Sequence, residues 1–318
     1  MNQDTQPILL VGAGPMAAEY ARVLKSLKKE FIVVGRNKQS AEEFEKIVGV
    51  KVIIGGVDKY LEQKKEIPPV AIVAINEEQL GSATIKLLKR GIKLILVEKP
   101  AGLDFADVKK VYKLSQKLKA KVYVGYNRRF YSSVKKAQEI IEKDGGILSI
   151  YFDFTEASFR IAPLTKAPGV KENWFLQNST HVIDLAFFLA GNPKNMYTFT
   201  NGGMSWHTKG AIFTGAGVTE KNVLFAYHAN WDAPGRWSLE IMTKNNKLIF
   251  KPLEKLQIQN LGSFEVKDVQ LEDKIATEFK AGIYAEVQSF LGNKKDLCTI
   301  DEQVANLKFY QQILEGGH

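Results

Sequence analysis

The chain of 318 residues is long enough for about two domains. With 45% apolar and 25% charged residues, it has the composition of an ordinary soluble protein. Its apolar runs are shorter than the roughly 18 residues of a membrane span, and a single cysteine, Cys298, excludes a disulfide framework or a cysteine metal cluster. We expect a cytoplasmic protein whose thiol is buried or inert.

The net charge of +9 favours an anionic substrate or cofactor. A nucleic-acid groove would interleave basic residues with aromatic ones, and no stretch of the sequence does so. The lysine-rich segment 109–121 has leucine and valine at helical spacing, which is typical of a helix with a solvated face. We therefore expect neither a nucleic acid nor a membrane as a partner.

The first 125 residues alternate short apolar runs with helical patterns. Runs rich in Val, Ile and Leu occur at 7–12, 31–35, 50–56, 70–75, 94–98 and 121–126. Helical patterns lie between them at 15–29, 39–48, 78–90 and 104–119. Continuous apolar runs indicate strands that are buried on both faces. The alternation predicts an α/β domain over residues 1–125, a doubly wound parallel sheet of the Rossmann type.

The pattern changes after Asn127. A helical pattern at 131–143 is followed by alternating, strand-like segments at 147–159, 222–232, 236–250 and 255–261. Further helical patterns lie at 273–291 and 301–314. Alternation of polar and apolar residues predicts strands with one exposed face. We expect a second domain, residues 126–318, of α+β architecture with a large, mostly antiparallel open sheet.

A glycine-rich turn follows the first predicted strand and opens the first predicted helix. Gly12 permits the sharp turn, Gly14 lets the backbone approach a pyrophosphate, and Pro15 suits the first helical turn. Small Ala17 stands where the third glycine of such turns lies. The turn predicts a dinucleotide site, and a purely structural turn is the alternative. Its cofactor-binding residues are Gly12, Ala13, Gly14, Pro15 and Met16.

The second predicted strand ends in Gly35-Arg36-Asn37 rather than in an acidic residue. NAD-preferring sites usually place Asp or Glu there, where it binds the ribose hydroxyls. Gly35 has no charge to repel a 2′-phosphate, and Arg36 offers a planar set of donors for one. Arg36 and Asn37 therefore predict cofactor contacts and a preference for NADP over NAD. An ordinary exposed turn is the alternative for Arg36.

The fifth predicted strand ends in Glu98-Lys99-Pro100. A lysine at the carboxyl end of a parallel strand points into the crevice where such sheets bind ligands. Pro100 ends the strand. Spacing alone leaves a catalytic and a structural role for Lys99 both open.

Five motifs together resemble those of the Gfo/Idh/MocA oxidoreductases, the relatives of glucose–fructose oxidoreductase and inositol dehydrogenase. They are GAGPMA (12–17), VAIN (73–76), EKP (98–100), GYNRRF (125–130) and HVID (181–184). The resemblance implies a Rossmann domain and a second domain whose open sheet joins subunits, hence a homodimer or homotetramer. It implies hydride transfer between a nicotinamide cofactor and a sugar or polyol carbon. It places Lys99 beside the nicotinamide and implies further cofactor contacts at Ala74, Ile75, Asn76, Glu98 and Asn127.

The segment 175–191 predicts a helix with a buried stripe, and Gln177, His181 and Asp184 lie on a neighbouring stripe. A histidine in such a place is often structural. The resemblance implies instead that His181 donates or accepts the substrate proton. Family members commonly have an aspartate where this chain has Gln177. A glutamine side chain binds a hydroxyl but cannot accept a proton.

The resemblance also implies substrate contacts, which we expect from Gln177, Asn178, Arg160 and Arg129. For Arg129, a pair with a carboxylate that holds the linker is the alternative. Several large side chains either line a sugar pocket or belong to the core or surface, namely Trp174, Trp206, Trp231 and Arg236.

Two substrate classes stay open, a nucleotide-linked or acidic sugar and a free polyol or aldose. A cofactor-binding regulator without catalysis and a methyl-donor-binding transferase are rivals from other classes. The transferase would normally have an acidic residue at the end of the second strand, and this chain has none there. The four histidines show no paired ligand spacing, so no metal site is expected.

Overall fold

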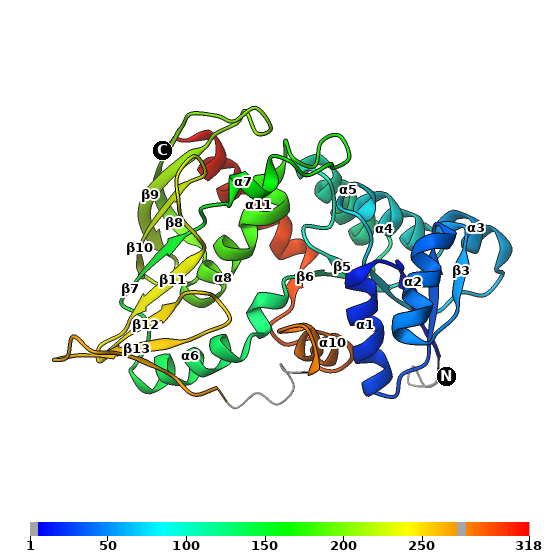
Figure 1. The fold of residues 1–318 in the computed structure, drawn as a ribbon, viewed down its shortest axis with the longest axis horizontal. Coiled ribbons are helices and arrows are strands. Elements are labelled where there is room, and N and C mark those ends of the chain that lie inside the picture. The colour runs from blue at the N-terminus through cyan, green and yellow to red at the C-terminus, as the bar shows by residue number, and fades with distance from the viewer. Residues whose placement is uncertain (1–5, 272–277, 318) are drawn as a thin grey trace. The chain divides into compact units, whose positions relative to one another are not determined.

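The chain forms two compact units, each built on one β-sheet (Figure 1). The computed structural model describes residues 6–271 and 278–317. The first unit comprises Met1–Asn127 and Ile275–Ala305, and the second comprises Arg128–Lys274 and Asn306–His318. The chain therefore returns to its first unit late in the sequence, which the sequence-based limits of 1–125 and 126–318 do not include. Among the described residues, no helix has the length and apolar content that crossing a bilayer requires.

The first unit contains a sheet of seven strands in the order β15-β6-β5-β4-β1-β2-β3. Its neighbours pair in parallel except β15, which runs antiparallel to β6. The strands are β1 (Ile8–Val11), β2 (Phe31–Gly35), β3 (Val52–Ile54), β4 (Val70–Val73), β5 (Leu94–Glu98), β6 (Lys121–Gly125) and β15 (Cys298–Thr299). The predicted doubly wound sheet is confirmed, and its apolar runs form the core of the unit.

Helices follow most of these strands. They are α1 (Pro15–Ser26), α2 (Lys38–Val48), α3 (Gly56–Gln63), α4 (Leu80–Lys89), α5 (Phe105–Lys117) and α10 (Ile283–Leu291), with short 3-10 turns at η2 (Glu77–Gln79) and η3 (Asn127–Phe130). Helix α3 was not predicted, because it is only 8 residues long and begins directly after Gly55. The predicted helix at 273–291 is represented by α10, and its residues 273–277 lie outside the described part of the chain.

The second unit contains a sheet of eight strands in the order β14-β13-β12-β11-β7-β10-β9-β8. Only β7 and β10 pair in parallel, so the predicted mostly antiparallel sheet is confirmed. The strands are β7 (Ser149–Asp153), β8 (Pro193–Asn201), β9 (Ile212–Thr219), β10 (Leu224–Asn230), β11 (Ser238–Met242), β12 (Asn246–Phe250), β13 (Gln257–Asn260) and β14 (Val266–Asp268). Strands β8, β9 and β14 were not predicted.

One face of this sheet is covered by helix α8, which contacts β7 and β11. Phe187 of this helix packs edge-on against Phe152 of β7, which stacks on Tyr227 of β10. Tyr197 and Phe199 on β8 remain about 60% exposed, at 60% and 61%. The remaining helices are α6 (Ser132–Lys143), α7 (Ser158–Ile161), η4 (Phe175–Ser179), α8 (Thr180–Ala190) and α11 (Ile300–Glu315).

Candidate functional site

The glycine turn lies at the carboxyl end of β1, where the order of the strands reverses between β1 and β4. Gly12 has a φ of +132°, and a Cβ at this position would lie 2.1 Å from the carbonyl oxygen of Ala74. The amide of Ala74 in turn donates to Val11 at 2.8 Å. Gly12 and Ala74, both predicted cofactor residues, therefore meet where doubly wound sheets bind ligands.

Gly14 is the N-cap of α1, with a φ of −92° that any residue can adopt. A Cβ on Gly14 would meet no protein atom within 4 Å. Neither backbone strain nor packing therefore requires a glycine here. Pro15 occupies the start of the helix, whose first amides point outward without intrahelical acceptors. The open space and the helix N-terminus fit a close-lying phosphate group.

The end of β2 has a packing reason for its glycine. A Cβ on Gly35 would lie 2.8 Å from Val52 Cγ1 and 2.9 Å from Ala13 Cβ. A larger side chain at this position would therefore require Val52 or Ala13 to move. The next residue, Arg36, is exposed. Asn37 is the N-cap of α2, where its side-chain oxygen accepts from the amide and the hydroxyl of Ser40 at 2.9 and 2.8 Å.

The remaining predicted cofactor residues of the first unit follow β4, β5 and β6. Ile75 and the exposed Asn76 lead into η2. Glu98 ends β5 and Lys99 follows it, half-buried. Burial raises the pKa of the Glu98 carboxyl, against the lowering effect of a hydrogen bond from Tyr20 and of the Lys99 charge. Asn127 follows β6 and donates its amide to the carbonyl of Ala281 at 2.9 Å.

Three further residues of the first unit lie beside these positions and were not predicted. The hydroxyl of Tyr20 is 2.9 Å from Glu98 and 3.0 Å from Glu286 on α10. The ammonium of Lys280 lies 3.0 Å from the sulfur of Met16, at the glycine turn. Lys280 and Glu286 come from the late segment of the chain, so no local pattern in the sequence connects them with the turn.

In the second unit, the predicted residues around His181 lie on η4 and α8. Gln177 and His181 are buried, with 2% and 6% exposure. The imidazole of His181 lies 6.1 Å from the ring of Trp237. Asp184, one turn further along α8, forms a bidentate pair with Arg129 at 2.8 and 2.5 Å. The sequence left a carboxylate partner open for Arg129, and the structure contains that pair.

Asn178 is held by a buried carboxylate that the sequence analysis missed. Its amide donates to both oxygens of Glu156 at 3.1 and 2.9 Å, and Ser179 donates to the same group at 2.8 Å. Burial raises the pKa of Glu156, while the hydrogen bonds from Ser179 and Asn178 oppose that rise. Glu156 follows β7 by a few residues, and its strand-like surroundings gave no sign of a polar site.

A cavity of about 430 Å³ opens beside Glu156. Its walls are largely apolar and come from segments after β7, β8 and β10, including Ala157, Phe159, Met204, Trp231 and Pro234. Arg160, on α7, is exposed, and its guanidinium lies 5.5 Å from the Phe159 ring.

The tryptophans belong mainly to the core. Trp206 and Trp231 stack at 5.7 Å, and Trp174 packs edge-on against Trp206. Of the predicted sugar-lining set, only Trp231 is among the residues around the 430 Å³ cavity. Arg236 is exposed and lies 4.7 Å over the ring of Trp237.

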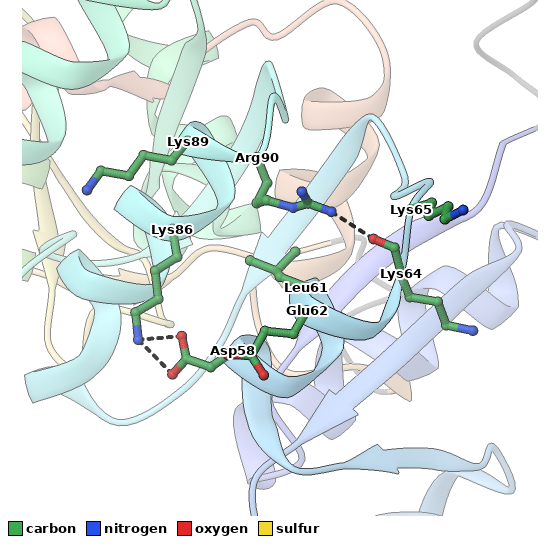
Figure 2. Close-up of a pocket in the computed structure, with 8 residues that line it drawn as sticks. All are labelled: Asp58, Leu61, Glu62, Lys64, Lys65, Lys86, Lys89 and Arg90. Carbon is green, nitrogen blue, oxygen red and sulfur yellow. Dashed lines mark hydrogen bonds and ion pairs between the residues drawn. The ribbon is translucent and has the colours of Figure 1, made fainter.

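A second cavity, of about 640 Å³, lies between α3 and α4 and is lined mainly by basic side chains (Figure 2). Lys86 pairs with Asp58 at 2.7 Å, and Arg90 donates to the carbonyl of Lys64 at 2.7 Å. Most of the residues that line this cavity lie near the C-termini of α3 and α4. In a parallel sheet with crossover helices, these C-termini face the amino edge of the sheet. The cavity is therefore on the edge opposite Gly12 and Lys99, and its cations offset the negative ends of the helix dipoles.

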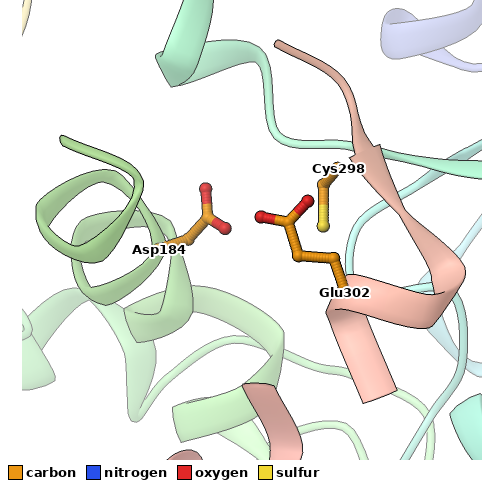
Figure 3. A group of neighbouring side chains, drawn as sticks. All are labelled: Asp184, Cys298 and Glu302. Carbon is orange, nitrogen blue, oxygen red and sulfur yellow. The ribbon is translucent and has the colours of Figure 1, made fainter. Parts of the chain in front are cut away.

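Figure 3 draws Asp184 on α8 together with Cys298 of β15 and Glu302 of α11. Asp184 belongs to the second unit, and the other two residues belong to the first. Each of the three residues also has a structural contact within its own unit. Asp184 pairs with Arg129, Cys298 pairs with Val124 in the sheet, and the amide of Glu302 donates to Thr299 at 3.1 Å. Cys298 is buried, as predicted.

Comparison with known proteins agrees with this arrangement. Residues 7–126 match the family model of the Gfo/Idh/MocA type, described as an oxidoreductase family with an NAD-binding Rossmann fold. No curated protein matches the chain in sequence.

Several solved structures are similar over almost the whole chain. The dehydrogenase MviM from Clostridium difficile has a TM-score of 0.76 at 18% identity, covering 97% of this chain and 98% of that one. UDP-N-acetylglucosamine 3-dehydrogenase from Acidithiobacillus ferrooxidans has a TM-score of 0.71 at 13% identity, covering 97% and 96%. An oxidoreductase from Agrobacterium radiobacter in complex with NAD+, L-tartaric acid and magnesium has a TM-score of 0.75 at 11% identity, covering 98% and 95%.

At these identities, the solved structures establish the fold and nothing finer. The match over residues 7–126 is more specific, because it covers the sheet and the glycine turn that a dinucleotide requires. The N-terminal domain, residues 7–126, therefore matches the Gfo/Idh/MocA family of oxidoreductases with an NAD-binding Rossmann fold.

Proposed function

We propose that the protein is an NADP(H)-dependent dehydrogenase or reductase that transfers a hydride between the nicotinamide and a sugar or polyol carbon. One observation carries this proposal. The glycine turn and Lys99 follow parallel strands of one sheet, β1 and β5, and therefore lie on its carboxyl edge. The open space at Gly14 supports it, because a glycine there serves a ligand rather than the fold.

Two side chains share the work on the substrate in this proposal. The bound nicotinamide supplies or accepts the hydride. Lys99 donates a hydrogen bond to the reacting oxygen and stabilises the negative charge that develops on it. His181 takes the hydroxyl proton during oxidation and returns it during reduction. Gln177, Asn178 and Arg160 bind the other polar groups of the substrate, and Arg129 supports them through the helix that carries His181.

The preference for NADP rests on Arg36. Its exposed guanidinium follows β2 and stands at the start of α2, whose N-terminus favours anions. Because Gly35 is closely packed, no carboxylate competes with a 2′-phosphate there. Asn37 uses its side-chain oxygen to cap α2 and keeps its amide for the ribose side of the cofactor.

For the substrate, we put a nucleotide-linked or acidic sugar first and a free polyol or aldose second. The net charge of +9 and the exposed Arg160 support an anionic substrate. A structural neighbour is named for activity on UDP-N-acetylglucosamine. We further propose a homodimer or homotetramer that associates through the open sheet, where Tyr197, Phe199 and Leu224 are exposed.

The test begins with cofactor binding and proceeds to turnover. Titration with NADPH and NADH, followed by thermal-shift screening of UDP-sugars, sugar acids and free polyols in the presence of NADP, identifies the ligand class. Oxidation of the stabilising compounds is then followed by nicotinamide absorbance. Turnover of a sugar or polyol supports the proposal. Binding of NADP without turnover of any compound in the panel would favour the non-catalytic regulator instead, which Gln177 in place of an aspartate would fit.

A further inference from the structure

Three side chains from three elements of the first unit meet at one hydroxyl group. Tyr20 comes from α1, Glu98 from the end of β5 and Glu286 from α10. The phenolic oxygen lies 2.9 Å from Oε1 of Glu98 and 3.0 Å from Oε2 of Glu286. Tyr20 and Glu286 are 0% exposed. Neither has a role in hydride transfer as proposed above.

The hydroxyl has too few hydrogens for two ionised carboxylates. A phenol carries one hydrogen and donates one hydrogen bond, whereas an ionised carboxylate only accepts. With both groups ionised, one carboxylate oxygen would face the lone pairs of the phenol at hydrogen-bond distance without a hydrogen between them. Away from water, such a contact is costly. We propose that Glu98 and Glu286 share one proton through Tyr20, so that one of the two carboxyls stays protonated at neutral pH.

The surroundings agree with a retained proton. Burial raises the pKa of Glu98. Burial, together with the charges of Glu286 and Glu98, raises the pKa of Tyr20 well above its usual value, so the phenol keeps its own hydrogen. The cations of Lys99, which follows β5, and of Lys280, which precedes α10, act on Glu98 in the opposite direction.

Packing around the three groups fixes their distances. Helix α1 contacts α10 along the unit. The ring of Phe290 on α10 packs edge-on against Tyr123 of β6 at 6.1 Å. At the end of β6, a Cβ on Gly125 would lie 3.2 Å from the hydroxyl of Tyr20, so the glycine leaves room for it. The contact is therefore held by the core rather than by mobile surface side chains.

The shared proton has a consequence for Lys99, and this consequence rests on the proposed function. Glu98 precedes Lys99 and accepts a hydrogen bond from its backbone amide. Retention of the proton limits the negative charge beside the lysine to about one carboxylate instead of two. Glu286 and Tyr20 are thus positioning residues, which set the charge next to Lys99 without touching the substrate.

Infrared difference spectroscopy of the resting protein tests the shared proton directly. At neutral pH, the wild type should show the carbonyl band of a protonated carboxyl, and both Glu286→Gln and Glu98→Gln should lose it. In either variant the phenol donates to the one remaining carboxylate, which needs no further proton. Glu139→Gln is the control, because Glu139 is exposed and its pKa is lowered by Lys136. The absence of the band from the wild type, or its survival in both pair variants, would overturn the proposal.

The pH profile of turnover tests the link to Lys99. Loss of the shared proton should appear in the pH profile of the wild type as an ionisation that the profile of Glu286→Gln lacks. The dissociation constant for NADP should differ between the two proteins by no more than about twofold. Identical pH profiles would contradict the link. The infrared result needs no activity, so a failure of the shared proton is distinguishable from a failure of the proposed function.

Discussion

Arg129 and Asp184 form a buried bidentate ion pair, with side-chain exposures of 3% and 1%. The pair anchors α8, the helix that carries His181, and the guanidinium also lies 4.7 Å over the ring of Phe188. Removal of one partner breaks a buried, bidentate ion pair, which typically costs about 3–5 kcal/mol. We expect Asp184→Asn to lower the free energy of unfolding by about this amount, measured by urea denaturation. The exposed pair of Lys136 and Glu139 is the control, and its loss should change the free energy of unfolding far less.

The two glycines of the turn should behave differently when each is replaced by alanine. Gly14→Ala adds a methyl group that meets no protein atom, so the melting temperature should change little while affinity for NADP falls about tenfold or more. Gly12→Ala places a methyl group against the carbonyl of Ala74 at positive φ, so it should destabilise the fold itself. Calorimetry and cofactor titration separate the two effects. Unchanged cofactor affinity in Gly14→Ala would argue against a phosphate at this turn.

Replacement of Arg36 should affect one cofactor selectively. Arg36→Leu removes a charge-assisted contact to the 2′-phosphate, typically worth about 1.5–3 kcal/mol. We expect the dissociation constant for NADPH to rise by about one to two orders of magnitude and that for NADH to stay nearly constant. NADH serves as the internal control, because it lacks the phosphate. An equal loss for both cofactors, or tighter binding of NADH to the wild type, would reject the assignment.

Replacement of Lys99 or His181 should lower turnover more than it weakens binding of the cofactor. Loss of one preorganised donor to a developing oxyanion commonly lowers kcat by about 10²–10³. Lys99→Met and His181→Gln should therefore slow the reaction by at least about a hundredfold, while affinity for NADP changes only slightly. Lys117→Met, in the last turn of α5, is a matched control. Full turnover in Lys99→Met would remove the lysine from the mechanism.

The shared proton also predicts how stability depends on pH. A carboxyl whose pKa is raised in the folded state binds its proton more tightly there than in the unfolded chain. This carboxyl makes its full contribution to the free energy of unfolding below the ordinary glutamate pKa, near pH 4.3. That contribution is lost as the pH rises through the pKa of the folded state. Stability should fall over this window by up to about 1.4 kcal/mol per pH unit. Glu286→Gln should lack this fall, whereas Glu139→Gln should keep it, in urea denaturation across the pH range.

Much of the first unit could be predicted because its strands are continuous apolar runs and its helices carry regular stripes. The glycine turn and Lys99 were placed correctly at strand ends, since parallel sheets put successive carboxyl ends on one edge. Helix α3 was missed, since its 8 residues are too few for a clear period. Strands β8 and β9 were missed because threonine, and in β9 also glycine, interrupts their apolar positions and weakens the alternation.

The unpredicted residues of the sites share one property. Tyr20 and Glu286 are 266 positions apart, and Glu156 is 22 positions from Asn178. Such contacts depend on how distant segments pack, which hydrophobic periodicity does not encode. The glutamates also lacked a distinguishing sign, because most glutamates lie on solvated surfaces. Only their burial in the folded protein reveals them.

The late return of the chain to the first unit affects how this protein is made. The edge strand β15 completes a sheet whose other strands leave the ribosome far earlier, and α10 packs against the early helix α1. Until residues near 300 are synthesised, the side of β6 that pairs with β15 stays open and Tyr20 has no Glu286 beside it. An isolated fragment ending near residue 127 would keep that exposed edge, which is prone to aggregation. The nucleotide-binding unit is therefore finished only when nearly the whole polypeptide exists.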